Sequence, residues 1–233
     1  PASYIFVIVG DTDEAKLLPL VEKYIATLPA KGDEEKFKDD GVRSIKGQHT
    51  FKREYQSTKR SDVGINIINS YAKYSFEGAI RLRALSEILK TALREKIRED
   101  KGQTYGFSLN AKLSRYPFEH SDMLISFTCD PANTDKIIAE IKEIIASIKS
   151  SGAILPKHLE DFKAQSEISI KKDYEKPEFW QKLIISNKIF NMPLYTADGY
   201  ISAVKAITND DIKEAAKLYL DEKNMVISIN NPK

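Results

Sequence analysis

The sequence has little cysteine, no long apolar run and no excess of charge of one sign, and each absence excludes a class of protein. Cys129 is the only cysteine, so no disulfide can form within the chain. No uninterrupted apolar stretch approaches the roughly 18 residues that a membrane-spanning helix needs. The 36 basic and 34 acidic residues are interspersed, which excludes the one-sided basic field of a nucleic-acid binder. We therefore expect no membrane span and no nucleic-acid partner.

Common catalytic and metal-binding motifs are also missing. None of His49, His120 and His158 has a second histidine three or four residues away, so a usual zinc site cannot form from close neighbours. Cys129 stands in an alternating apolar run, which predicts a buried thiol rather than a nucleophile. There is no glycine-rich phosphate loop and no G-x-S-x-G elbow. We expect no metal site in this chain and no catalysis by this chain alone.

What is present is enough for a folded core. The chain has 233 residues, of which 42% are hydrophobic and 30% charged, and this favours one or two globular domains. It starts at a proline instead of a methionine and enters an apolar run within a few residues. We interpret it as a piece of a longer polypeptide.

The first 50 residues predict one β-α unit and a linker. Residues 4–9, "YIFVIV", are typical of a strand buried on both faces, and Gly10 ends the run. Asp11 is the expected N-cap of a helix that continues to Pro29, with Glu14 three residues after the cap. Residues 31–50 are charged and rich in glycine, without periodicity, so they are expected to form a linker.

The region from 51 to 129 predicts four strands and one long helix. Residues 51–56, 61–71, 105–111 and 123–129 are the expected strands, and the last two should form a hairpin. Between the pairs, Ser75 is the expected cap of a helix that Gly102 ends. Its apolar stripe consists of Leu82, Leu85, Leu89, Leu93 and Ile97.

Helices dominate the rest of the chain. An amphipathic helix is expected after Pro131, with Ile137, Ile141, Ile144 and Ile148 on one face, and further helices begin near Pro156 and Pro177. Thr208 and Asp211 form a capping-box pattern for a shorter helix, and residues 224–229 read as a final strand. The order of elements predicts an α+β fold with a largely antiparallel sheet that helices cover on one face.

One short stretch, "REDKGQTYGFS" at residues 98–108, has two interpretations. Arg98 suits the C-terminal end of a helix as a solvated cation, because a positive charge complements the helix dipole there. Tyr105 is in phase with Phe107 and Leu109, which would make it part of the core. The residues by themselves favour this structural interpretation over a functional one.

The sequence "LREKIREDKGQTYGFSLNAKL" resembles the helix-turn-strand segment of the pitrilysin/insulinase family of zinc metallopeptidases, the H-x-x-E-H inverzincins. In that family an arginine is followed seven residues later by a tyrosine, as Arg98 is by Tyr105. Residues 5–29 are similar to the closing strand and helix of one family domain, and residues 203–232 to the close of the next. The resemblance therefore implies that residues 1–30 are the end of a preceding domain. Residues 31–50 are then a linker, and residues 51–233 form the following domain.

The resemblance implies the fold of a pitrilysin or mitochondrial processing peptidase domain, but not a catalytic one. The helix expected at residues 76–99 has no histidine, so the H-x-x-E-H motif is absent from the equivalent place. The implied function is that of a non-catalytic C-terminal domain in a zinc metalloendopeptidase that cuts peptides in an enclosed chamber. Zinc would be bound by another domain. Tyr105 would donate its O–H to the oxyanion or substrate carbonyl, and Arg98 would bind the substrate backbone.

The resemblance also implies partners and leaves alternatives open. The partners are the N-terminal zinc-bearing half, in the same polypeptide or as a separate subunit, and peptide substrates that add as a strand to a sheet edge. Bacterial relatives suggest a periplasmic or otherwise exported location. One alternative is a non-catalytic structural or peptide-binding subunit of the same fold, and another is an unrelated α+β interaction domain in which the spacing of Arg98 and Tyr105 is accidental.

Overall fold

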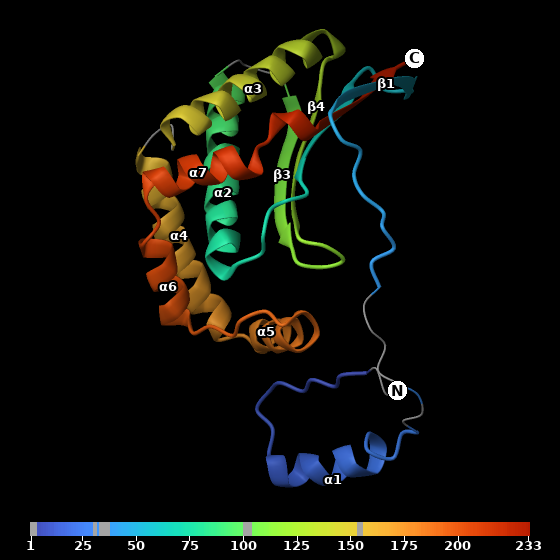
Figure 1. Ribbon diagram of the computed structural model, residues 1–233, viewed down its shortest axis with the longest axis vertical. Helices are drawn as coiled ribbons and strands as arrows, with labels where there is room; N and C mark the ends of the chain where they lie inside the picture. Colours follow the sequence, from blue (N-terminus) through green and yellow to red (C-terminus); the bar gives the residue numbers. More distant parts are fainter. Residues whose placement is uncertain (1–3, 30–31, 33–37, 100–103, 153–155) are drawn as a thin grey trace.

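A mixed five-stranded sheet forms the centre of the computed structural model, which describes residues 4–29, 32, 38–99, 104–152 and 156–233 (Figure 1). The side chains of Gln56, residues 97–99 and Tyr105 also lie outside the description. The strands are β1 (Gln48–Gln56), β2 (Ser61–Asn69), β3 (Thr104–Ser114), β4 (His120–Cys129) and β5 (Met225–Pro232).

The strand order β1-β5-β2-β4-β3 places the first and third strands at the two edges. β1 pairs with β5 in parallel, whereas the other three pairings are antiparallel. Ile65 at the centre of β2 lies opposite Ile125 of β4 on one side and Ile227 of β5 on the other. The predicted α+β class, with a largely antiparallel sheet, is confirmed.

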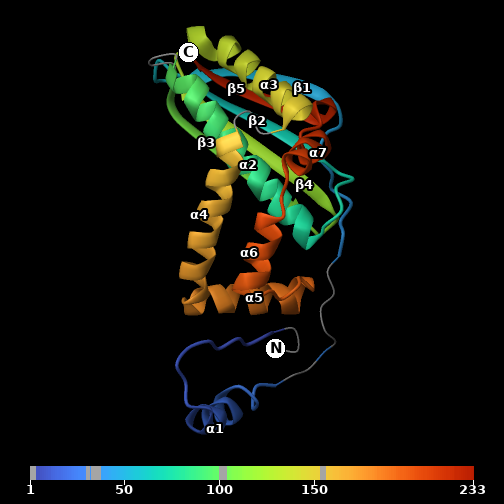
Figure 2. The same ribbon diagram turned by 90° about the vertical axis from the view of Figure 1, so that its left-hand side faces the viewer.

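Helices cover one face of this sheet, as predicted (Figures 1 and 2). Figure 2 shows α2, α3 and α7 in front of the strands, while α4 and α6 run beyond the sheet towards α5. The helices of the described residues are α1 (Glu14–Tyr24), α2 (Phe76–Glu99), α3 (Thr134–Ser151), α4 (Pro156–Tyr174), α5 (Pro177–Phe190), α6 (Ala197–Lys205) and α7 (Asn209–Tyr219), with 3₁₀ turns at Pro131–Asn133 and Glu222–Asn224.

The core lies between the sheet and these helices. β2 alternates buried and half-buried residues along its whole length, because one of its faces packs against helices. The predicted stripe of α2 is buried at Leu82, Leu85, Leu89 and Leu93, while Ile97 lies outside the described side chains. On α3 the buried stripe includes Ile145, and the predicted Ile144 is only half-buried.

Local signals explain where several helices begin. The Ser75 hydroxyl accepts a hydrogen bond from the backbone N–H of Gly78 at 2.9 Å, so Ser75 caps α2 as predicted. Thr208 and Asp211 form the predicted capping box at the start of α7. The cap of α1 is Asp13, which accepts from the Ala15 N–H, so the prediction of Asp11 was wrong by two residues.

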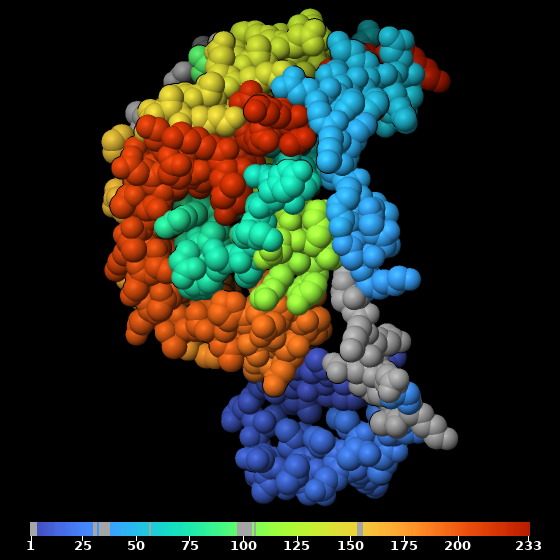
Figure 3. Space-filling model, viewed as in Figure 1, coloured from blue at the N-terminus to red at the C-terminus, as the bar shows by residue number. Residues whose placement is uncertain are grey.

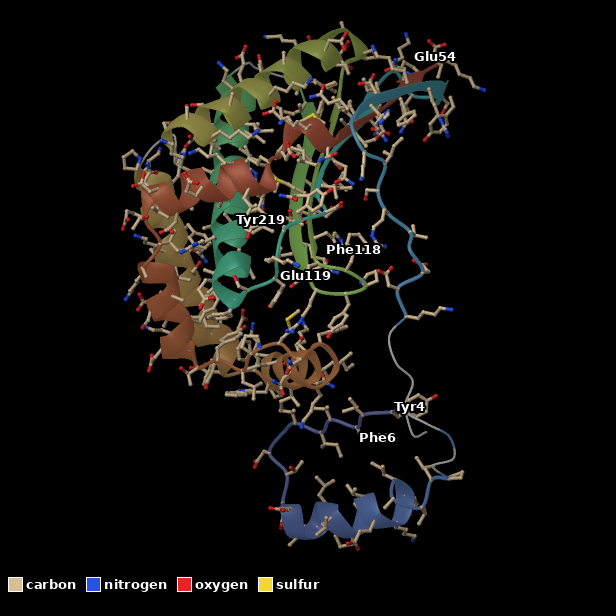
Figure 4. The ribbon with its side chains drawn as sticks, viewed as in Figure 1. Tyr4, Phe6, Glu54, Phe118, Glu119 and Tyr219 are labelled. Carbon is tan, nitrogen blue, oxygen red and sulfur yellow. The ribbon has the colours of Figure 1, made fainter. Side chains whose placement is uncertain are left out.

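The predicted strand at residues 4–9 is absent from the structure. This segment is unpaired, and most of its apolar side chains are exposed: Tyr4 is 72% exposed, while Val7 and Val9 are half-buried. Figure 3 shows residues 4–29 as a lobe outside the packed body, and Figure 4 shows Tyr4 and Phe6 far from the sheet. A strand exists only where a neighbour pairs with its backbone, and no strand of the described residues is beside this segment.

Two further differences concern boundaries and a missed helix. β1 begins at Gln48, so three residues that the expected linker included are paired in the sheet.

α6 was not predicted at all. It is a nine-residue helix with Gly199 near its start, and both its shortness and this glycine weaken the sequence pattern.

Candidate functional site

The candidate site lies where α2 ends and β3 begins. Arg98 is in the last turn of α2, and Tyr105 is the second residue of β3, so the predicted pair brackets one helix-to-strand connection. The structure describes the backbone of both residues, but their side chains and Gly102 lie outside the described part of the chain. That Arg98 and Tyr105 reach one cleft therefore stays a prediction.

An irregularity in strand pairing occurs at Tyr105. Thr104 is opposite Cys129 and Gly106 is opposite Thr128, so β3 has one residue more than β4 between these two pairs. Such a bulge interrupts the alternation of faces along a strand. The buried Leu109 and half-buried Phe107 keep to the helix-covered face, but their phase does not extend back through the bulge to position 105. The sequence-based argument that Tyr105 belongs to the core assumes that β3 alternates regularly from residue 105 onward. The bulge breaks this alternation, so the assumption does not hold.

β3 is an edge strand. It pairs with β4 on one side and with no other strand among the described residues. The backbone N–H and C=O groups along its free side are therefore available to an added strand. The other edge is β1, at the far side of the sheet (Figure 1).

A shallow hollow of about 400 Å³ lies on the uncovered face of the sheet, next to the start of β3. Its lining includes Asp62 and a set of small residues from neighbouring strands: Gly64, Gly106, Ser108, Ser126 and Thr128. Ser108, Ser126 and Gly64 are consecutive partners across β3, β4 and β2. Because these side chains are short, the backbone of the sheet is accessible from this side.

The end of β4 that faces Thr104 is tightly packed. Cys129 is fully buried, as predicted, and its Sγ lies 3.4 Å from the Thr134 hydroxyl. Burial raises the pKa of the Cys129 thiol above its ordinary value. A buried thiol with a raised pKa is a poor nucleophile, so its position supports a packing role.

The end of α2 is bound to the start of α4. One carboxylate oxygen of Glu95 lies 3.0 Å from Nε2 of His158, and the other lies 3.4 Å from Nζ of Lys157. Burial by itself would raise the pKa of Glu95, but the hydrogen bond from Lys157 and the attraction of His158 outweigh it, and the pKa lies below its usual range.

Sequence reasoning missed this contact. The apolar stripe predicted for α2 leaves Glu95 out, and His158 was considered only as a possible zinc ligand. The two residues are 63 positions apart, and no motif joins them. Only the packing of α4 against α2 brings the carboxylate to the imidazole.

The described residues contain no group of three or more His, Cys, Asp and Glu side chains arranged to hold a metal ion. In the same ranges no helix combines the length and the apolar character that crossing a bilayer requires.

Comparison with known proteins identifies the family. The family model described as the peptidase M16 inactive domain matches residues 1–166. This chain belongs to the peptidase M16 inactive-domain family. The pitrilysin-like resemblance of the sequence is thereby confirmed, and with it the assignment to a non-catalytic domain of a metallopeptidase family. No curated protein matches the chain.

Solved structures of M16-like proteins share the fold. The chain is similar to the periplasmic protease PqqL from Escherichia coli (TM-score 0.78, 18% identity) over 96% of this chain and 25% of that one. A protease from Helicobacter pylori gives a TM-score of 0.75 at 17% identity, covering 96% of this chain and 54% of that one. The M16 inactive domain from Pseudomonas fluorescens gives 0.73 at 16% identity, covering 96% and 52%. This M16 chain thus spans about a quarter to a half of these proteins.

Proposed function

We propose that this chain is the substrate-clamping, non-catalytic C-terminal domain of a zinc metalloendopeptidase that cuts peptides in an enclosed chamber. The observation that carries the proposal is the α2–β3 connection, in which Arg98 ends a helix and Tyr105 opens an edge strand at a bulge. Membership in the M16 inactive-domain family supports it.

In this proposal Tyr105 and Arg98 complete an active site whose zinc is bound by another domain. The described residues of this chain do not fit a zinc site, so they supply only donors and binding surface. The metal would activate the attacking water. Tyr105 donates its phenolic O–H to the oxyanion or to the substrate carbonyl, where charge develops during attack. Arg98 pairs with the substrate backbone close by.

The free edge of β3 supports a mode of peptide binding. A substrate in an extended conformation pairs with unpaired backbone groups of this edge and passes Tyr105 at its start. Backbone pairing is tolerant of sequence, and the small side chains of the adjacent hollow leave space for residues of different size. The substrate class is therefore unfolded or extended peptide rather than one sequence.

Residues 1–30 fit a preceding domain better than this one. Residues 4–29 expose many large apolar side chains: Tyr4, Ile5, Phe6, Ile8, Leu18, Leu20, Tyr24 and Leu28. An apolar surface of this kind marks an interaction site. In the proposed enzyme it is buried against the sheet and helices of the domain that precedes residues 31–50, which act as the linker, and residues 51–233 form the inactive domain.

The alternative is a non-catalytic structural or peptide-binding subunit of the same fold. It uses the same edge strand but requires no zinc-bearing partner. The upstream reading frame discriminates between the two functions, because the peptidase requires an H-x-x-E-H motif there or in a separate subunit. A periplasmic or otherwise exported location is part of the proposal, supported by one similar structure that is a periplasmic protease.

Reconstitution tests the proposal. The chain is mixed with the zinc-bearing half, and cleavage of an internally quenched peptide is followed by fluorescence. We expect neither zinc retention nor cleavage from the chain alone and cleavage from the mixture. Activity of the chain alone would contradict the proposal, and so would a zinc-bearing half that reaches full activity without it.

A further inference from the structure

The last turn of α2 is attached to the rest of the body by a polar contact. Glu95 lies three residues before Arg98, so the two occupy neighbouring positions along one side of the helix. The Glu95 carboxylate is held by the first turn of α4, between Nζ of Lys157 at 3.4 Å and Nε2 of His158 at 3.0 Å. After Leu93 the structure describes the side chains of Arg94, Glu95 and Lys96, which are polar and either exposed or half-buried.

His158 has no other described partner. Its side chain is 1% exposed, and its Nδ1 is buried without a hydrogen bond. Breaking the bond to Glu95 would leave both ring nitrogens buried and unpaired, which is costly because each loses water without gaining a partner. The contact is therefore maintained more strongly than an ion pair between two exposed side chains.

A cleft of about 590 Å³ lies between α2 and α4 over about three turns before this contact. It is lined by Arg83 and Thr91 from α2 and by Gln165 and Ser169 from α4. The buried Phe162 of α4 also lines the cleft, so the two helices pack against each other along only part of this stretch. The contact between Glu95 and His158 lies at one end of this cleft, where His158 is part of the lining.

We propose that Glu95 is a positioning residue: held by His158 and Lys157, it places the last turn of α2 so that Arg98 can bind the substrate backbone. The inference rests on the function proposed above for Arg98. It adds a second element, α4, to the machinery that shapes the site, although α4 contributes no group that touches substrate.

Enzyme kinetics and amide exchange test this role. In the complete peptidase, Glu95→Gln removes the negative charge and replaces one of the two acceptor oxygens by an NH2 group, so the side chain cannot bind both His158 and Lys157, and Arg98 shifts. We expect KM to rise about tenfold with kcat little changed. This effect is smaller than the roughly 10²-fold loss of activity that a misplacement of 1 Å can cause, because Arg98 is expected to move only modestly. In the full chain by itself, amide exchange should accelerate at residues 95–99 and not in the first two turns of α2.

Three further variants make the result specific. Glu87→Gln makes the same change two turns earlier on α2, where Glu87 pairs with Lys90 of its own helix at 3.6 Å, and should leave KM unchanged. His158→Gln retains an N–H near the position of Nε2 and should keep most of the substrate affinity, whereas His158→Leu should not. Melting temperatures identify any variant that fails to fold, and Glu95→Gln is the safer substitution because that side chain is 42% exposed.

Comparison with Arg98→Ala separates this inference from the proposed function. If Arg98→Ala leaves KM unchanged, the role proposed for Arg98 fails. If Arg98→Ala raises KM but Glu95→Gln does not, the function stands and the positioning role is overturned. If both raise KM, Glu95→Gln should add nothing in the Arg98→Ala background, because it acts through Arg98. Effects that multiply in the double variant would overturn the inference.

Discussion

The guanidinium carbon of Arg43 lies 3.8 Å from the centre of the Phe118 ring. Arg43 belongs to the segment that leads from α1 to β1, and Phe118 is in the turn of the β3–β4 hairpin, where Figure 4 labels it. On its other side Arg43 pairs with the carboxylate of Asp39, with an Nη1 to Oδ1 distance of 2.8 Å. This cation–π contact thus binds the middle of the linker to the body.

Removing that contact should free the linker. Arg43→Ala is expected to accelerate amide exchange in residues 38–46 by about two- to fivefold, since an exposed cation–π contact contributes roughly 0.5–1 kcal/mol. Lys46→Ala, which removes a charge from the same segment without touching an aromatic ring, should leave the exchange unchanged. Equal effects of the two variants would show that net charge, not the Phe118 contact, restrains the linker.

Acid should weaken the contact between α4 and α6. Hydrogen bonds from Lys171 and then Lys205 lower the pKa of Glu167 to about 2. A carboxylate with a lowered folded-state pKa stabilises the fold above its ordinary pKa of 4.5, and this contribution is lost as pH falls from there towards 2. Glu167→Gln should flatten the pH dependence of the free energy of unfolding in this window and not between pH 6 and 8. A variant as acid-sensitive as the original chain would contradict the assignment.

The centre of the sheet should be the part least tolerant of truncation. Ile65 is 0% exposed and lies between Ile125 and Ile227, so Ile65→Ala leaves a cavity with neighbours on both sides. We expect a loss of about 2–5 kcal/mol in the free energy of unfolding, measured by urea denaturation. Ile168→Ala, at a side chain that is 62% exposed, should cost far less. Similar losses from both would mean that the core is elsewhere.

The N-terminal lobe should be dispensable for the stability of the body. Deleting residues 1–37 is expected to leave the melting temperature of the remaining chain unchanged, because residues 4–9 pair with no strand and α1 has no buried residue. The same deletion should weaken association with the zinc-bearing half, measured by titration calorimetry. A large fall in melting temperature with unchanged association would assign the lobe to this domain instead.

Regular elements could be predicted because their signals are local. Leu82, Leu85 and Leu89 lie at helical spacing, and they are buried in α2 as that spacing requires. Ser75 and Thr208 indicate where two helices begin, because their side chains can accept hydrogen bonds from the first turn of the helix. The prediction of a strand at residues 4–9 was wrong because strand pairing is not a local property. An apolar run indicates a tendency to form a strand, but it does not show whether a neighbouring strand is there to pair with it.

The candidate site was predictable only in part. The spacing of Arg98 and Tyr105 is visible in the sequence, and the backbone puts them at the two ends of one connection. The bulge at Tyr105 depends on pairing with β4, and the bond between Glu95 and His158 depends on how α4 packs. Neither leaves a periodic signal, because both are relations between distant segments.

The role of Tyr105 is the central claim, and one substitution tests it most directly. Tyr105→Phe in the complete peptidase removes only the phenolic O–H, and losing such a donor typically costs on the order of 10²–10³ in kcat. Tyr71→Phe makes the same change at a side chain that is 76% exposed and serves as the control. We predict a fall of about that size for Tyr105→Phe, with an unchanged melting temperature and zinc content. Turnover equal to that of Tyr71→Phe would contradict the account.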